Sequence, residues 1–544
     1  MKPILFFALP LLLFTSCKQK DIAETSQSIY LTPEVMCGTV QFTDGCGEKT
    51  DTLIRFGIAL LHHMTYEDAG YTFDQVIKKD SDCFWGYWGK AMAYIHPLWP
   101  DVLTEDEMES GYVLSQKAMA LAKNEKEKLY GTALASFYQK GEKTKGERLI
   151  AFQQGWSKAT EQLPDDPEAA LFNGLFRLGT VSPADKSFTV QREVGAMAER
   201  YMAQYPDHPG AFHYAIHAYD VPPLATKALA VARSYGKIAP EIPHALHMPS
   251  HIFTRLGYWQ ESIDWNSRSA TAAAKLPYKG EVSPHYFHAL DYEVYAMLQQ
   301  GNDEGARQIA RNLDTIKAPI NVAAAAAYAL AAIPGRLPLE NHQWAEAAAV
   351  PLPDTAQFNW KKFPQWEGLI HYARGLGGAK SGKKEIAQAS LDRLAALQTQ
   401  LGNTPQTKYW FDQMEAQKTS IMAWMNYAEG KKDEALAFMQ IAADLEDATV
   451  KNPVSPGELL PARELLGDML MEMNRPADAL VAYETSLQTR PNRFNSLFGA
   501  GMAAEKSGDE KKAHTYYSQL ITIAGNGPST RDQLDHARKV TTPG

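Results

Sequence analysis

The 544-residue sequence has no hydrophobic run after its first residues that is long enough to cross a membrane as a helix. It also has no excess of positive charge, because 54 Lys and Arg face 63 Asp and Glu and the formal net charge is -9. A chain without a basic footprint is not expected to bind nucleic acid. We therefore expect no nucleic-acid partner.

Two further absences concern fold and chemistry. The strict apolar–polar alternation of strands is hard to find, whereas amphipathic helical runs extend from about residue 51 to residue 539, so we expect an all-α fold. The sequence contains no nucleophile-elbow serine with its histidine and acid, no phosphate loop and no H-E-x-x-H motif. The common signatures of serine hydrolases, nucleotide-binding proteins and zinc proteases are therefore missing.

Cysteine is scarce, with four in the chain, and the first belongs to a targeting segment. Lys2 precedes an apolar run over residues 3–14, which has the length of a signal-peptide core. The run ends in Phe14-Thr-Ser-Cys17, which resembles the lipobox of bacterial lipoproteins, where the cysteine is lipidated. The resemblance implies a signal peptide over 1–17, a tether and short loop region over 18–50, and a lipid anchor in the cell envelope, with the outer membrane favoured. An ordinary cleaved signal with an incidental cysteine is the alternative.

The other cysteines allow one short disulfide outside the cytoplasm. Cys37 and Cys46 flank a glycine-rich, turn-like segment and could close a small loop before the first helix. Cys83 is interpreted as a buried free thiol.

A repeat is clearest near the C-terminus, where Ala479 and Ala513 occupy equivalent places 34 residues apart. This spacing resembles the tetratricopeptide repeat, a helix–turn–helix unit with a glycine that closes its first helix. Further units follow the turns at Gly257, Gly301, Gly382, Gly430 and Gly508, and others contain Tyr66, Trp344 and Asn474. We expect a superhelical solenoid of degenerate repeats, divided into residues 51–206, 207–310, 311–450 and 451–540.

Histidine is unevenly distributed. Seven of the 15 histidines lie between residues 213 and 288, where an even distribution would place about two. They are His213, His217, His244, His247, His251, His285 and His288. Spacings of three and four residues bring such side chains onto one face of a helix. Other histidines, including His62 and His208, are interpreted as packing, capping, core or solvated residues.

The resemblance to the repeat gives these residues a register. In such repeats, positions 2, 5, 9 and 12 of the first helix line the concave groove. The residues at these positions are His244, His247 and His251 in one repeat, His288, Asp291 and Tyr295 in the next, and His213, His217 and Asp220 in a third. Pro249 should disfavour helical geometry at Met248 and kink or restart the helix there. Three successive helices would still point imidazoles and carboxylates into one groove.

Imidazole is the commonest protein ligand of metal ions, and a catalytic zinc site uses three protein ligands plus water. The candidate ligands are His213, His217, His244, His247, His251, His288 and Asp291, while Asp220, His285 and Tyr295 are candidate groove residues. Zinc or copper would suit these donors, nickel is also allowed, and so is a second ion. The alternative is that the histidines bond backbone or carboxylate groups, or that the groove binds an acidic peptide.

Several of these motifs together are similar to a family of large bacterial tetratricopeptide-repeat proteins. The motifs are His-x-Pro-Ser-His251, His213-Tyr-x-Ile-His217, His288-x-x-Asp291 and Pro-x-Pro-Gly-Glu458. The last belongs to the stretch from Lys451 to Glu464, which is interpreted as a rigid elbow whose charges could reach the groove. The resemblance supports the fold and implies no activity.

Three function classes remain open. The first is a membrane-tethered repeat protein whose groove holds a protein, a peptide or a metal ion. The second is a metal-dependent enzyme of hydrolase type, with Asp220 or Asp291 as base or ligand. An outer-membrane glycan-capture lipoprotein is the least favoured class, because its arginine-rich segments are not found.

Overall fold

The computed structural model describes residues 30–43, 45–99, 101–182, 185–278, 280–356, 358–525, 527 and 529–542. The signal peptide, Cys17 and the first part of the tether lie outside the described residues. Within the described ranges there is no β-strand, only two isolated bridges that pair Tyr278 with Glu281 and Val282 with Ile320. The all-α prediction is confirmed. No described helix combines the length and the apolar character that a membrane span requires.

The α-helices run in chain order as α1 (Glu48–His62), α2 (Tyr66–Lys79), α3 (Phe84–Met92), α4 (Glu105–Leu121), α5 (Glu125–Phe137), α6 (Lys145–Gln162), α7 (Pro167–Gly179), α8 (Thr189–Gln204), α9 (Pro209–Tyr219), α10 (Leu229–Tyr235), α11 (Pro243–His247), α12 (Pro249–Leu256), α13 (Trp259–Ala273), α14 (Pro284–Gln299), α15 (Asp303–Asp314), α16 (Ala324–Glu340), α17 (Trp344–Ala347), α18 (Pro364–Lys380), α19 (Lys384–Leu401), α20 (Lys408–Ala428), α21 (Lys432–Asp447), α22 (Ala462–Glu472), α23 (Pro476–Thr489), α24 (Phe494–Lys506), α25 (Glu510–Ala524) and α26 (Asp532–Thr541). Two short 3-10 helices cover Ala225–Ala228 and Trp360–Lys362.

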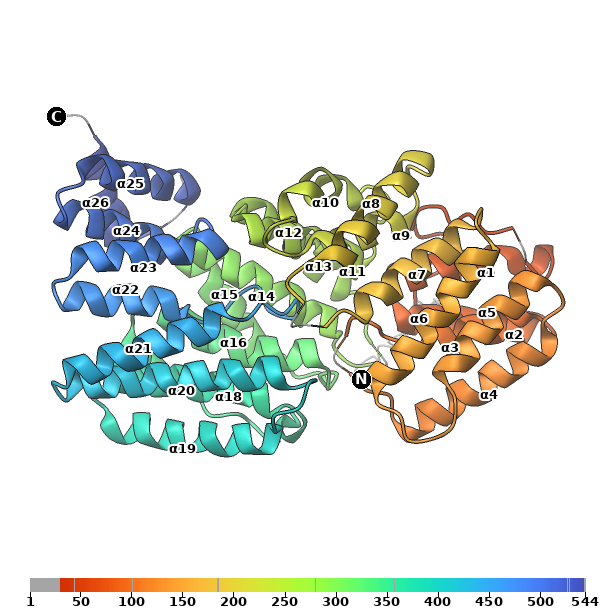
Figure 1. Cartoon of the computed structure of the whole chain (residues 1–544), viewed down its shortest axis with the longest axis horizontal. Coiled ribbons are helices and arrows are strands. Elements are labelled where there is room, and N and C mark those ends of the chain that lie inside the picture. The colour runs from red at the N-terminus through yellow and green to blue at the C-terminus, as the bar shows by residue number, and fades with distance from the viewer. Residues whose placement is uncertain are drawn as a thin grey trace, which may run out of the picture.

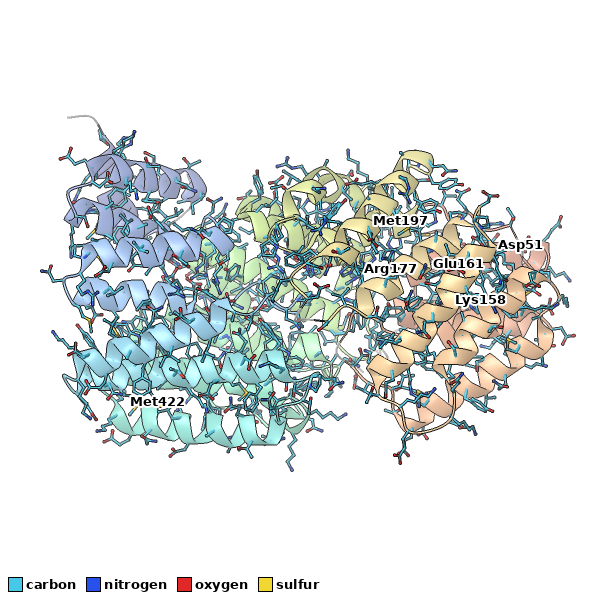
Figure 2. The ribbon with its side chains drawn as sticks, in the orientation of Figure 1. Asp51, Lys158, Glu161, Arg177, Met197 and Met422 are labelled. Carbon is cyan, nitrogen blue, oxygen red and sulfur yellow. A yellow bond between two sulfur atoms is a disulfide. The ribbon has the colours of Figure 1, made fainter. Side chains whose placement is uncertain are left out.

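The helices stack in sequence order into an elongated superhelix, with α1 to α7 at one end and α18 to α26 at the other (Figure 1). Each helix packs its apolar face inward. In α6, for example, Phe152 and Trp156 are fully buried, whereas Lys158 and Glu161 are exposed (Figure 2). A helix with one apolar face needs a neighbour to cover it, and in a solenoid the next pair supplies that cover.

Eight helix pairs share one turn, which establishes the tetratricopeptide-type repeat. A left-handed residue follows the first helix of each pair, with φ between 52° and 79°. These residues are Met64, Gly257, Gly301, His342, Gly382, Gly430, Asn474 and Gly508. In every case the next N–H donates to the carbonyl five residues earlier, as from Tyr258 to Phe253 or from Asp509 to Ala504. This Schellman closure suits glycine, which has no Cβ to strain a positive φ. The predicted turns are thus confirmed.

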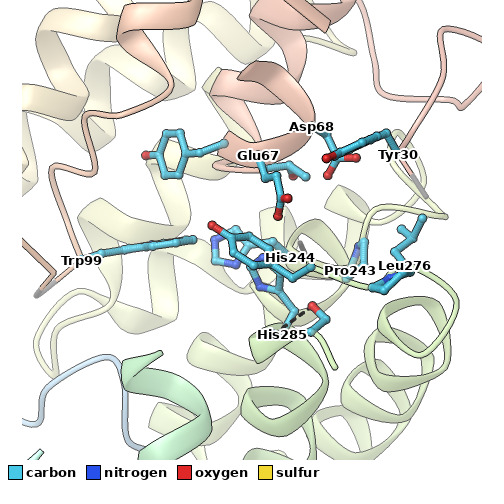
Figure 3. A pocket seen from close by; sticks show the side chains of 13 residues that line it. Tyr30, Glu67, Asp68, Trp99, Pro243, His244, Leu276 and His285 are labelled. Carbon is cyan, nitrogen blue, oxygen red and sulfur yellow. Dashed lines mark hydrogen bonds between the residues drawn. The ribbon is translucent and has the colours of Figure 1, made fainter. Parts of the chain in front are cut away.

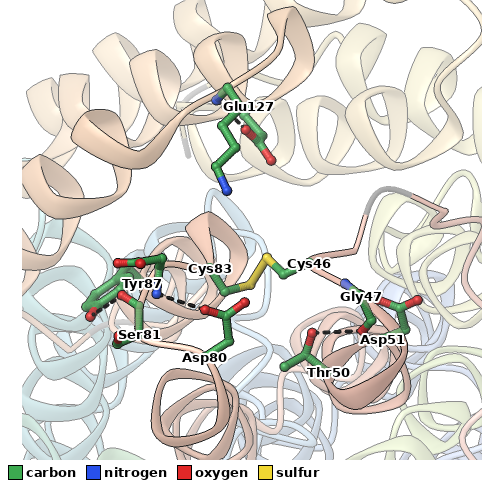
Figure 4. Close-up of a disulfide and its surroundings, with 11 residues drawn as sticks. Cys46, Gly47, Thr50, Asp51, Asp80, Ser81, Cys83, Tyr87 and Glu127 are labelled. Carbon is green, nitrogen blue, oxygen red and sulfur yellow. Dashed lines mark hydrogen bonds between the residues drawn. A yellow bond between two sulfur atoms is a disulfide. The ribbon is translucent and has the colours of Figure 1, made fainter.

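The prediction for the cysteines is wrong. Cys46 forms a disulfide with Cys83, at a Cα–Cα distance of 5.5 Å (Figure 4). Cys37 is the buried free thiol. The Cys37 carbonyl accepts from His63 at the C-terminal end of α1, whereas Cys46 precedes the N-terminal end of the same helix. A helix of 15 residues is about 22 Å long, far beyond the reach of a disulfide. The described residues between Cys37 and Cys46 therefore run along α1 and do not close a small loop.

Two large hydrophobic cores divide the molecule. One includes residues from Leu31 to Phe253, and the other includes residues from Ala270 to Ala537. They meet where α11 and α12 pack against α14. The connection between α21 and α22 returns to this junction, because the carbonyls of Pro453 and Ser455 accept from the hydroxyl of Tyr292 on α14. We call residues 451–461 of this connection the strap.

Candidate metal centre

All seven clustered histidines meet at the junction of the two cores. His213 and His217 come from α9, His244 and His247 from α11, His251 from α12, and His285 and His288 from α14. Their rings form one continuous group, with centroids 5.1 Å apart for His213 and His244, 5.4 Å for His244 and His285, 4.2 Å for His247 and His288, and 6.3 Å for His217 and His251. Histidines that are up to 75 residues apart in sequence thus share one site.

The helix restarts at Pro249 as expected, because α11 ends at His247 and α12 begins at Pro249, but the expected loss of helical geometry at Met248 is not seen. Met248 keeps helical dihedrals, with φ -52° and ψ -38°, and its N–H donates to the His244 carbonyl. The proline occupies the first turn of α12, where its missing N–H is tolerated. His247 and His251 consequently lie on one face, with their Nε2 atoms 2.9 Å apart.

Four of the seven histidines do not line an open groove, whereas His217, His285 and His288 are half-buried. His213, His244, His247 and His251 are all at most 6% exposed. The ring of Tyr292 lies 4.8 Å from that of His247 and 5.2 Å from that of His251, and its hydroxyl holds the strap. On the other side, the Trp99 ring lies 6.1 Å from His244 and 6.0 Å from His285. Aromatic side chains and the strap therefore cover the concave surface here.

His247, His251 and His288, which we call the first triad, each offer one ligand atom within 4.8 Å of the others. The outer nitrogens of two of them are fixed by oxygen acceptors. His247 Nδ1 lies 2.7 Å from Asn266 Oδ1, and His251 Nδ1 lies 3.0 Å from Asp220 Oδ2. The Asn266 amide is oriented by its own bond, because its Nδ2 donates to the Ser262 carbonyl at 2.7 Å.

These bonds determine the tautomers of the pair. A carboxylate and an amide oxygen can only accept, so Nδ1 carries the proton in both His247 and His251. Their Nε2 atoms then present lone pairs to each other across 2.9 Å. That contact is repulsive for two neutral rings, but it matches two ligands of one ion: with bonds of about 2.0–2.1 Å, ligand atoms are about 2.9 Å apart in an octahedral site and about 3.3 Å in a tetrahedral one.

Burial keeps the imidazoles neutral. Desolvation lowers the pKa of His217 to about 3 and that of His285 to about 4. It also lowers the pKa of His251, although Asp220 opposes that shift. Neutral imidazole is the form that binds metal.

His213, His217 and His244 form a second triad, again with ligand atoms within 4.8 Å. His213 Nδ1 donates to the His62 carbonyl at 2.6 Å, which leaves Nε2 to face His217 Nε2 at 3.1 Å. His244 is 6% exposed, and neither of its ring nitrogens has a hydrogen-bond partner among the described residues.

The carboxylates predicted near the metal have other partners. Asp220 accepts from His251 and, at 2.7 Å, from Arg255 Nε, so it acts through His251. Asp291 Oδ1 lies 3.4 Å from Arg336, and burial raises the pKa of Asp291 to about 6. The structure thus places Asp291 beside an arginine and not in either triad.

Two other predicted groove residues also lie outside the triads. The Tyr295 hydroxyl accepts from Arg493 at 3.1 Å. The His285 ring packs against the His244 ring, with centroids 5.4 Å apart, but His285 belongs to neither triad.

One further cluster escaped the sequence analysis. Glu168 Oε2 lies 2.6 Å from His62 Nε2, and Glu168 Oε1 lies 3.0 Å from His208 Nε2. The Gln41 N–H and the Tyr214 hydroxyl complete this network. All three central side chains are fully buried, and the two histidines hold the pKa of Glu168 below its usual range. The carboxylate joins α1, α7 and the residue before α9, and nothing in the local sequence marks it.

Two small cavities adjoin the centre. One of about 20 Å³ is bordered by His244, His285 and Trp99, with Tyr30 and Glu67 at its rim (Figure 3). A second of about 70 Å³ is bordered by Arg255, Lys451 and strap residues including Gly457. Burial lowers the pKa of Lys451 to about 7. Each cavity has room for at least one water molecule or small ion.

No protein-family model and no curated protein matches this sequence. Solved structures do match. The APC/C hetero-tetramer Cut9–Hcn1 is 13% identical over 89% of this chain and 96% of the other, with a TM-score of 0.28. The human IFIT1 dimer with m7Gppp-AAAA is 11% identical over 78% and 88%, with a TM-score of 0.35. The TPR domain of P58(IPK) is 12% identical over 90% and 98%, with a TM-score of 0.21. TM-scores this low carry no argument about this chain, whose repeat fold follows from its eight shared turns.

Proposed function

We propose that this chain is a helical-repeat binding protein that holds a transition-metal ion at His247, His251 and His288. The observation that carries the proposal is the 2.9 Å distance between Nε2 of His247 and Nε2 of His251. In both rings the other nitrogen, Nδ1, donates a hydrogen bond, so neither Nε2 carries a proton. Metal-ligating histidines commonly donate their other N–H to a carboxylate or carbonyl oxygen, which fixes the ring. Zinc and copper suit three imidazoles, whereas magnesium and calcium prefer oxygen ligands.

The remaining parts of the proposal concern location and partners. Lipidation at Cys17 would tether the chain in the cell envelope, with the outer membrane favoured. The Cys46–Cys83 disulfide supports a compartment outside the cytoplasm, since disulfides persist in oxidising surroundings. A protein or peptide partner accords with the extended surface of a repeat solenoid.

A metal-dependent hydrolase is the second candidate. Three histidines leave further coordination positions on the ion to water, as in catalytic zinc sites, and a metal ion can lower the pKa of such water to about 7. Because Asp220 and Asp291 are engaged by Arg255 and Arg336, the geometry does not support either as the base. Lys451, Arg255 and Arg490 border the adjoining cavity and are the cations placed to meet an anionic group there.

The test is elemental analysis of the protein lacking residues 1–17, purified without a histidine tag, loaded with zinc or copper and dialysed. The wild type should retain at least one ion per chain, and the His247→Ala/His251→Ala variant should lose the ion of the first triad. His514 is exposed on α25, so His514→Ala is the matched control and should behave as wild type. A folded wild type that retains no ion would overturn the proposal.

A further inference from the structure

The second triad contains a buried histidine, His244, whose ring nitrogens lack hydrogen-bond partners among the described residues, and the first triad does not supply them. His244 is 6% exposed and faces the rings of His213 and His285, yet both of its nitrogens lack a hydrogen-bond partner among the described residues. A neutral imidazole has one donor and one acceptor, and buried polar groups of this kind are normally satisfied. A ligand bound at His244 would give these ring nitrogens the partner they need.

His213 and His217 complete such a site. The His62 carbonyl fixes the proton of His213 on Nδ1, so its Nε2 lone pair points to the Nε2 of His217 at 3.1 Å. His217 alone could satisfy this contact by donating a proton, but that choice leaves His244 unpaired. His213, His217 and His244 each offer one nitrogen within 4.8 Å of the other two. The nitrogens of His213 and His217 face each other and that of His244 has no partner among the described residues, so the three form a preorganised set of metal ligands.

We infer that His213, His217 and His244 hold a second transition-metal ion beside the ion of the first triad, so that the protein carries a two-metal centre. The inference rests on the proposed function for the first ion. The two triads are adjacent: the His217 and His251 rings lie 6.3 Å apart, as do the His244 and His247 rings. Helix α11 supplies one ligand to each.

The charge of the ligands determines what else such a centre binds. All six are neutral imidazoles, and the nearby carboxylates Asp220 and Asp291 are already paired with Arg255 and Arg336. Two divalent ions would therefore bring four positive charges that the triads do not offset. This charge would favour anionic ligands at the open positions of the two ions, and hydrolytic chemistry is what such a two-metal centre would supply.

The experiment counts ions by elemental analysis after zinc or copper loading and dialysis of the protein lacking residues 1–17. The wild type and the His514→Ala control should retain two ions, and His244→Phe and His251→Ala should retain one each. Phenylalanine keeps the ring volume at position 244. If circular dichroism shows that His244→Phe does not fold, His217→Asn replaces it, with the same expected loss of one ion.

The outcomes separate the two proposals. One ion in the wild type that is lost in His251→Ala and kept in His244→Phe would overturn the second site and leave the first. One ion lost in both variants would mean a single ion shared by the triads, which also overturns the inference. No ion in the wild type would overturn both proposals.

Discussion

At the scale of single residues, the account depends on the acceptors behind the histidines. Asn266 and Asp220 set the tautomers of His247 and His251, and neither residue would touch the ion. The clustering of histidines was predictable from sequence, because their spacing and excess are local. The carboxylate partner of each histidine was not predictable, because these contacts join residues that are distant in sequence. His251 and Asp220 are 31 residues apart, and Asp291 pairs with Arg336 and not with a histidine.

Asn266 offers a clean test of this second layer of contacts. Replacement by leucine removes the acceptor from His247 at similar volume, and the loss of such a partner typically lowers metal affinity about 10- to 100-fold. Asn266→Asp keeps an acceptor oxygen and should retain most of the affinity. Competition with a chelator of known affinity measures both variants. Equal affinity of Asn266→Leu and wild type would contradict the role of Asn266.

Lys451 predicts a dependence of stability on pH. Burial lowers its pKa to about 7 in the folded protein, whereas an unfolded lysine titrates at about 10.4. Between these values the unfolded state binds more protons, so this group makes the free energy of unfolding rise with pH. Lys451→Met lacks this contribution, so the free energy of unfolding of the wild type should rise relative to that of the variant by on the order of 3 kcal/mol between pH 6.5 and 9.5.

Urea unfolding of the metal-free proteins at the two pH values measures that difference. The hydrogen bond from Lys451 to the Ser455 carbonyl is lost in the variant at both values and contributes equally. A stability difference between the two proteins that does not change with pH would show that Lys451 is not buried at the junction.

At the scale of elements, local sequence predicted the helices and their turns well. The glycines of the five predicted turns, from Gly257 to Gly508, adopt positive φ as their position requires. The disulfide was missed because its pairing depends on tertiary structure. Cys37 and Cys46 lie near opposite ends of α1, and Cys83, before α3, lies beside Cys46.

The disulfide closes a loop with a sequence separation of 37 residues, and removal of such a bond typically lowers the free energy of unfolding by about 2–4 kcal/mol. We expect Cys46→Ser to show this loss in urea unfolding without reductant. Cys37→Ser leaves the bond intact and should leave no free thiol in the protein lacking residues 1–17. Two free thiols in Cys37→Ser would instead mean that Cys37 is a disulfide partner.

At the scale of the whole molecule, the metal centre lies where the two cores meet. α9, α11 and α12 come from the first core and α14 from the second, and the strap binds α14 from a segment more than 150 residues later. The repeat register predicted from the sequence that these helices face one concave surface. It did not show that Tyr292, Trp99 and the strap cover that surface, because those contacts join distant parts of the chain.

The most direct measurement is anomalous diffraction at the metal absorption edge from crystals of the loaded protein lacking residues 1–17. The account predicts an anomalous peak about 2.0–2.1 Å from Nε2 of both His247 and His251. A fully loaded crystal with no peak between these atoms, and with their 2.9 Å contact unchanged, would contradict it.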